Sequence, residues 1–147
     1  MKKFDFRLQK VLDVKEMVLK KMKKDLALLK KQKAESEKEL NRLLNNFEEF
    51  CSKMHLDKEQ TISEIKLEYS YYYQYLDEIE LQKKEIADLN IKIEQLRKKF
   101  IETQQDKKVL SKLKDKYNEI YIVEQQKKEQ VLLDEIAVIG AHNSGNL

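Results

Sequence analysis

The sequence predicts an all-α protein: a long antiparallel two-helix coiled coil (an α-hairpin) with a short or bent helix after the turn. Three observations predict it. Charged residues make up 39 % of the chain and Pro is absent, which is typical of long helices. Both glycines lie near the C-terminal end, at Gly140 and Gly145, so turn residues are scarce elsewhere. Two stretches carry apolar residues at alternating spacings of three and four, the pattern of a coiled-coil seam.

The first seam predicts a helix over residues 4–54. Apolar side chains fill all but three of its fourteen positions, and neither Gly nor Pro interrupts it. These positions are Leu8, Leu12, Lys15, Leu19, Met22, Leu26, Leu29, Lys33, Ser36, Leu40, Leu43, Phe47, Phe50 and Met54. Such a helix cannot bury its seam alone, so a partner helix of similar length is expected.

The heptad pattern breaks at residues 55–74, which we expect to form the tip of the hairpin. A turn is expected at about residues 55–61, followed by a short or bent helix. Thr61 and Glu64 have the spacing of a capping box at a helix start, and Asp57 is the alternative N-cap.

The second seam predicts a helix over residues 75–139. Its positions are Tyr75, Ile79, Gln82, Ile86, Leu89, Ile93, Leu96, Phe100, Thr103, Lys107, Leu110, Leu113, Tyr117 and Ile120. The two consecutive steps of three after Lys107 indicate a stammer, which overwinds a coiled coil. Gly140 is the expected helix end, with residues 140–147 as a frayed tail.

Pairing the two seams antiparallel sets Leu26 and Leu29 near Thr103 and Phe100. It leaves an overhang at residues 122–139 with no partner in the chain. The overhang carries Val131, Leu132, Leu133, Ile136, Val138 and Ile139. An exposed apolar patch of this kind marks a binding site, and self-association into a dimer is the alternative.

Five tyrosines, Tyr69, Tyr71, Tyr72, Tyr73 and Tyr75, fall within seven residues of the tip. They point all round a helix, so one partner helix cannot cover them all. About half are expected to fold back onto Phe47 and Phe50. The rest would be exposed aromatics, a residue class enriched at interfaces.

Catalysis, cofactors and metal sites are not expected. His55 and His142 lie in the turn and the tail, and with one cysteine they make no metal constellation. No Gly-rich phosphate loop is present. The lone Cys51 fits a reducing compartment, and neither a membrane span nor a secretory signal is apparent. A cytoplasmic, non-enzymatic protein without a small-molecule substrate is therefore expected.

Positive charge gathers in the first helix, between Lys20 and Lys33. Residues 20–33 hold seven lysines and one acidic residue, Asp25. Such a cluster could bind nucleic acid or anionic lipid, meet an acidic protein, or form a solvated outer face. It lacks the interleaved aromatics on which single-strand binders stack bases, so nucleic acid is the less favoured partner.

The two ends of the chain resemble those of a known family. The opening Phe4-x-Phe6-x-Leu8-Gln9-x-Val11-Leu12, followed by Lys15-Glu16, resembles the start of the flagellar export protein FliJ. The segment Glu124 to Ala137, with Asp134-Glu135-Ile136-Ala137, is similar to that family's C-terminal segment. Length, the two-helix pattern and the tyrosines after the turn are similar too.

The resemblance implies a component of the flagellar type III export apparatus, similar in fold to the central stalk of rotary ATPases. Members bind and promote a hexameric export ATPase ring, contact the cytoplasmic domain of the membrane export gate, and interact with export chaperones. It implies a location in the cytoplasm, peripheral to the membrane at the flagellar base. ATPase binding would fall on Phe4, Phe6, Leu8, Val131, Leu132, Leu133 and Ile136. Gate binding would fall on Leu43, Phe47, Phe50, Tyr72 and Ile79.

Two other hypotheses come from the residues alone. One is a structural coiled coil that dimerises through the overhang. The other is a coiled-coil arm that binds nucleic acid through the Lys20–Lys33 face, for which a steep salt dependence would be diagnostic.

Overall fold

The computed structural model describes residues 3–54 and 59–145, which form the helices α1 (Gln9–Lys53) and α2 (Ile62–Gly145) and no strand. By their internal packing they divide into two compact units. The loop unit comprises residues 20–101, and the terminal unit comprises residues 1–19 and 102–147. In each unit a part of α1 packs on a part of α2. Because both described elements are helices, the predicted all-α class is confirmed.

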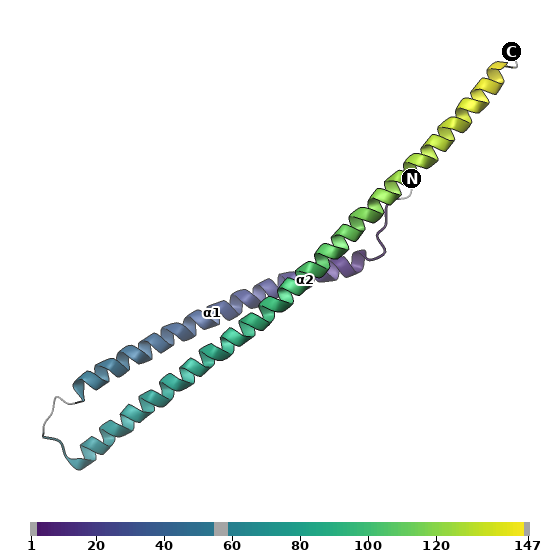
Figure 1. Cartoon of the computed structure of the whole chain (residues 1–147). Helices are drawn as coiled ribbons and strands as arrows, with labels where there is room; N and C mark the ends of the chain where they lie inside the picture. Colours follow the sequence, from purple (N-terminus) through teal and green to yellow (C-terminus); the bar gives the residue numbers. More distant parts are fainter. Residues whose placement is uncertain (1–2, 55–58, 146–147) are drawn as a thin grey trace. The chain divides into compact units, whose positions relative to one another are not determined.

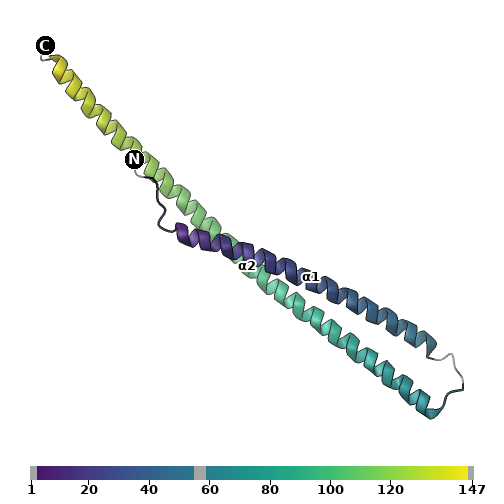
Figure 2. The same cartoon turned by 180° about the vertical axis from the view of Figure 1, so that it is seen from behind.

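Within the loop unit, Lys20–Lys53 of α1 and Ile62–Ile101 of α2 run side by side in opposite directions (Figures 1 and 2). Phe47 contacts Tyr72, and Ser36 contacts Gln82. As the residue number rises along α1, the number of the partner on α2 falls, so the pair is antiparallel.

The first predicted seam is confirmed at every position. All fourteen residues are buried or partly buried, and Leu12, Leu19, Ser36 and Leu43 are buried. On the second helix the prediction holds from Tyr75 to Leu110. The energetic reason is that burying one Leu or Ile side chain contributes roughly 1.5–3 kcal/mol, so the stripe that carries these residues must face the partner helix.

Leu113, the second step of the predicted stammer, is partly buried, but the seam predicted beyond it is wrong, because Tyr117 and Ile120 are about half exposed. Covered residues also follow Leu110 at Lys114, Asn118, Tyr121 and Gln125, in steps of four, four, three and four. Two consecutive steps of four make a stutter, which unwinds a coiled coil rather than overwinding it. The register relaxes here because α1 begins only at Gln9, so no helix lies opposite to impose a strict heptad.

The predicted helix pairing is also displaced. The prediction sets Ser36 opposite residue 93 and Lys15 opposite residue 114, whereas Ser36 contacts Gln82 and Lys15 contacts Asp106. The shift amounts to roughly two to three turns. It arises because pairing starts soon after the turn, where the tyrosine segment already packs on Phe47 and Phe50.

Several helix bounds differ from the predicted ones. α1 starts at Gln9 instead of residue 4, because residues 4–6 are extended and the first turn is set by Gln9 N–H donating to the Phe6 carbonyl at 3.0 Å. α2 is continuous from Ile62, so residues 62–74 do not form a separate or bent helix. It also runs through Gly140 to Gly145. A helical Gly costs only about 1 kcal/mol relative to Ala, too little to end the helix there.

The start of α2 follows the predicted capping chemistry. Glu64 N–H donates to Thr61 Oγ1 at 3.3 Å, and Ile65 N–H donates to the Thr61 carbonyl at 3.1 Å. Thr61 is therefore the N-cap. The alternative, Asp57, lies outside the described residues.

Candidate interaction surfaces

The features of the described residues that bear on function are metal-ligating groups, membrane spans and exposed surfaces that are not packed on the chain. Among residues 3–54 and 59–145, no group of His, Cys, Asp and Glu side chains could hold a metal ion. None of the helices in that part of the chain is long and apolar enough to cross a bilayer. The exposed hydrogen bond between the Arg42 guanidinium and the Glu39 carboxylate lowers the pKa of Glu39 and raises the pKa of Arg42.

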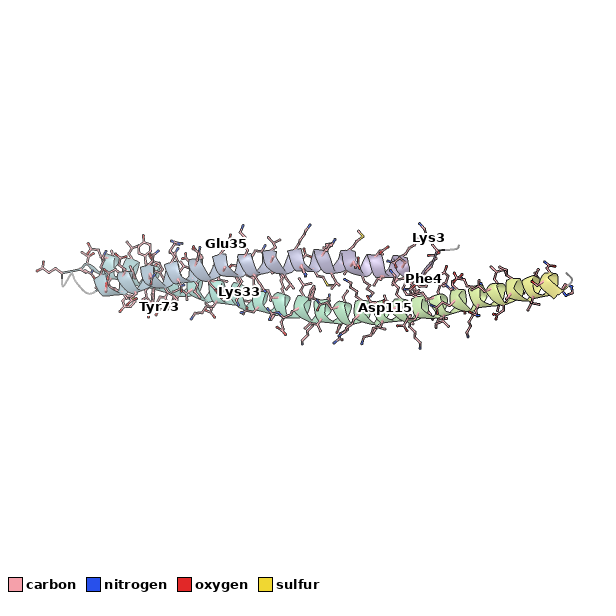
Figure 3. The ribbon with its side chains drawn as sticks, turned by 90° about the horizontal axis from the view of Figure 1, so that it is seen from above. Lys3, Phe4, Lys33, Glu35, Tyr73 and Asp115 are labelled. Atoms are coloured by element: carbon pink, nitrogen blue, oxygen red, sulfur yellow. The ribbon has the colours of Figure 1, made fainter. Side chains whose placement is uncertain are left out.

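The N-terminal residues predicted to bind an ATPase pack largely on the chain itself. Phe6 is 5 % exposed, and its ring lies 6.2 Å from that of Tyr117. Phe4 lies against α2 (Figure 3), with its ring 5.7 Å from that of Tyr121. Leu8 is partly buried. Phe6 therefore stabilises the terminal unit, whereas Phe4 keeps part of its surface at the edge of the packed region.

Two ion pairs accompany this packing in the terminal unit. Lys15 Nζ lies 3.4 Å from Asp106 Oδ2, and Lys107 Nζ lies 3.7 Å from Glu16 Oε1. Both are largely solvated, so each contributes at most about 1 kcal/mol. The paired residues nevertheless show which turn of α1 lies beside which turn of α2.

The C-terminal residues predicted to bind an ATPase are fully available. Every residue from Gln126 to Gly145 is exposed, and in Figures 1 and 2 no other segment of the terminal unit lies beside this yellow end of α2. We call residues 126–145 the free segment. It starts four residues later than the predicted overhang and ends six residues beyond it.

One side of the free segment continues the seam of α2. Four of its residues, 56–60 % exposed, lie along one stripe at 100° per residue, namely Leu132, Leu133, Ile136 and Ile139. The stripe follows directly from Tyr121 and Gln125, which are still partly covered. Val131, Asp134, Glu135, Val138 and Ile139 line a shallow open hollow beside it. The helix thus presents an apolar face that the described residues of its own unit leave uncovered.

The residues predicted to bind an export gate lie in or beside the seam of the loop unit. Leu43 and Ile79 are buried. Phe47 packs on both Tyr72 and Tyr75, at ring separations of 5.4 and 5.9 Å, and Phe50 lies 5.4 Å from Tyr75. The predicted split of the tyrosines is confirmed, because Tyr72 and Tyr75 are partly covered while Tyr69, Tyr71 and Tyr73 are exposed.

The sequence analysis missed an exposed apolar stripe at the start of α2. It consists of Ile62, Ile65, Tyr69, Tyr73 and Leu76. The spacings of three and four that join these residues put them on one side of the helix, next to the seam. We call them the α2 stripe. The same spacing of apolar residues is visible in the sequence between Ile62 and Leu76, upstream of the seam predicted from Tyr75.

Together these features define an all-helical interaction protein, with paired seams for stability and unpaired apolar stripes for partners. The family described as "Flagellar FliJ protein" matches residues 3–146. The chain belongs to this family, a non-catalytic component of flagellar protein export. Comparison with curated proteins and with solved structures gave no match.

Proposed function

We propose that this protein binds a hexameric export ATPase ring through the free segment and promotes its activity without catalysing a reaction itself. The observation that carries the proposal is the continuous apolar stripe of Leu132, Leu133, Ile136 and Ile139, exposed on a helix that has no partner in its own unit. An isolated helix of this length is only marginally stable in water. A partner that covers the stripe would gain roughly 1.5–3 kcal/mol for each side chain fully buried.

The N-terminal lead has a supporting role in this proposal. The rings of Phe4 and Phe6 hold residues 3–8 against α2 at Tyr121 and Tyr117, close to the start of the free segment. Phe4 and Val131 would then contact the ring at the edge of the contact area, with Leu132, Leu133 and Ile136 at its centre. Phe6 and Leu8 would hold residues 3–8 in this position.

Sedimentation velocity with the purified export ATPase tests this function. The protein should co-sediment with the ATPase and raise the fraction of hexamer. If the protein alone sediments faster with rising concentration and ignores the ATPase, it is a coiled-coil dimer. If it sediments with duplex DNA in a strongly salt-dependent way instead, it is a nucleic-acid-binding arm.

A second contact, with the cytoplasmic domain of the membrane export gate, is proposed for the α2 stripe. This surface adjoins the predicted gate residues Phe47, Phe50 and Tyr72, and its side chains are exposed whereas theirs are largely engaged with one another. Binding to both the ring and the gate would place the protein in the cytoplasm at the flagellar base, where export chaperones are further partners.

Replacing Tyr69 and Tyr73 by Ala should weaken gate binding at least tenfold without lowering the melting temperature. Both rings are more than half exposed, so their removal leaves no cavity, while exposed aromatic rings are frequent binding hot spots. Calorimetric titration with the gate domain measures the effect. The control variant Phe47→Ala with Tyr75→Ala should instead lower the melting temperature. Unchanged gate affinity in the Tyr69 and Tyr73 variant would contradict the assignment.

A further inference from the structure

The two sides of the loop unit, viewed across its pair of helices, carry opposite charge. On one side an open groove of about 610 Å³ is lined by residues from both helices, including Glu35, Glu39, Glu85 and Asp88. We call this the acidic groove. Its lining also includes Gln32 and Lys92. Gln32, Glu39, Glu85 and Lys92 each stand immediately before a seam residue.

The other side of the loop unit is basic. Lys23, Lys30 and Arg97 each stand immediately after a seam residue, namely Met22, Leu29 and Leu96. In an antiparallel pair, equivalent heptad positions of the two helices flank the seam on the same side. Since the positions before the seam line the acidic groove, these three cations lie on the side away from it.

Further lysines extend this side over the outer surface of α1. Lys20, Lys24 and Lys31 follow at helical spacing and are exposed, whereas Lys33 points toward α2 (Figure 3). The contact of Ser36 with Gln82 sets the register that brings Arg97 beside the start of the lysine run. We call Lys20, Lys23, Lys24, Lys30, Lys31 and Arg97 the basic face.

The six cations of the basic face have no ion-pair partner among the described residues. Glu94 is the acidic residue that α2 contributes to this side. The fold therefore concentrates charge that the sequence shows only as a run of lysines on one helix.

We propose that the basic face binds the surface of an anionic phospholipid membrane. Five of its six cations are lysines, which act as flexible point charges suited to a diffuse array of headgroups. The face carries no aromatic ring to stack bases, and Arg97 is the one residue in it with a guanidinium fork of the kind that reads base edges. The acidic groove on the far side would be repelled by the same membrane, so binding orients the unit. The inference is independent of the ATPase proposal, and it is compatible with a component of flagellar protein export, a process that carries proteins across a membrane.

Co-sedimentation of the full-length protein with lipid vesicles tests the proposal. The protein should bind vesicles that contain phosphatidylglycerol at low salt, lose affinity at about 0.15 M salt as screening grows, and ignore vesicles of phosphatidylcholine alone. Changing Lys20, Lys23, Lys24, Lys30 and Lys31 to Gln should lower the affinity on the order of a thousandfold, since each lysine near an anionic surface contributes a factor of about five. Helix content should persist, because Gln and Lys have similar helix propensities.

Two matched variants test whether the affinity for vesicles depends on where the positive charge lies or only on how much of it there is. Changing the exposed Lys84, Lys108, Lys112, Lys127 and Lys128 to Gln removes the same net charge and should lower the affinity much less. Changing the five face lysines to Arg should keep the affinity. The proposal fails if the wild-type protein does not bind the anionic vesicles, if both Gln variants lose affinity equally, or if a duplex DNA displaces the vesicles at equal phosphate concentration.

Discussion

Removal of residues 126–147 is expected to abolish stimulation of the export ATPase and to leave the melting temperature of the remaining chain unchanged. The described residues that are lost are all exposed, so no packed seam goes with them. The rings of Phe4 and Tyr121 stay in contact, because Tyr121 lies before the cut. ATP hydrolysis at saturating protein, together with thermal unfolding followed by circular dichroism, measures both parts.

The two readouts of this truncation have different meanings. Normal stimulation by the shortened protein would place the ATPase contact elsewhere and contradict the proposed function. A lower melting temperature with lost stimulation would show that the free segment also stabilises the terminal unit, in which case point variants on its surface decide the function.

Ile93→Asp is expected to destabilise the loop unit by about 3 kcal/mol or more, since it buries an unpaired carboxylate in the seam. Ile93 is 7 % exposed and lies on the α2 segment that the register sets opposite Leu26 and Leu29. Urea denaturation followed by helix content measures the loss.

Ile91→Asp is the matched control for this experiment. It makes the same substitution two residues away on the same helix, but Ile91 is 56 % exposed. Its effect should stay within about 0.5 kcal/mol, as for most surface substitutions. Equal destabilisation by the two variants would show that Ile93 does not face α1.

Which residues face the partner helix could be predicted from the sequence because that question is local. From Leu8 to Met54 the alternating steps of three and four pick out one stripe of α1, and the structure covers each position. The free energy gained by burying the apolar residues of that stripe outweighs the helix propensities of single residues. Lys15, Lys33 and Ser36 lie on the same stripe, so they are covered together with their apolar neighbours.

The register between the helices could not be predicted in the same way. A heptad pattern repeats every seven residues, so sliding α2 by whole heptads keeps apolar residues opposite one another. Non-periodic contacts decide between the alternatives. Gln82 Nε2 donates to the Ser36 carbonyl at 3.1 Å inside the seam, and Phe47 and Phe50 engage Tyr72 and Tyr75 beside the turn. A polar group in the seam is a known determinant of register.

The candidate surfaces were only partly predictable for a related reason. The uncovered apolar face around Leu132 and Ile136 could be predicted because the second helix extends beyond the end of the first. The burial of Phe6 depends on an extended segment folding back onto Tyr117, which no helical period describes. The basic face needs Arg97, which only the antiparallel register brings near Lys23.

The most direct test of the central proposal, that the apolar stripe of the free segment binds the ATPase, is a comparison of two double variants in the ATP hydrolysis assay. Leu132→Gln with Ile136→Gln makes the stripe polar, whereas Glu124→Gln with Lys127→Gln changes positions outside the stripe without altering net charge. All four residues are exposed, so neither variant should change the fold. We expect the first to lose most of the stimulation and the second to retain it. Equal stimulation by both variants would contradict the proposal.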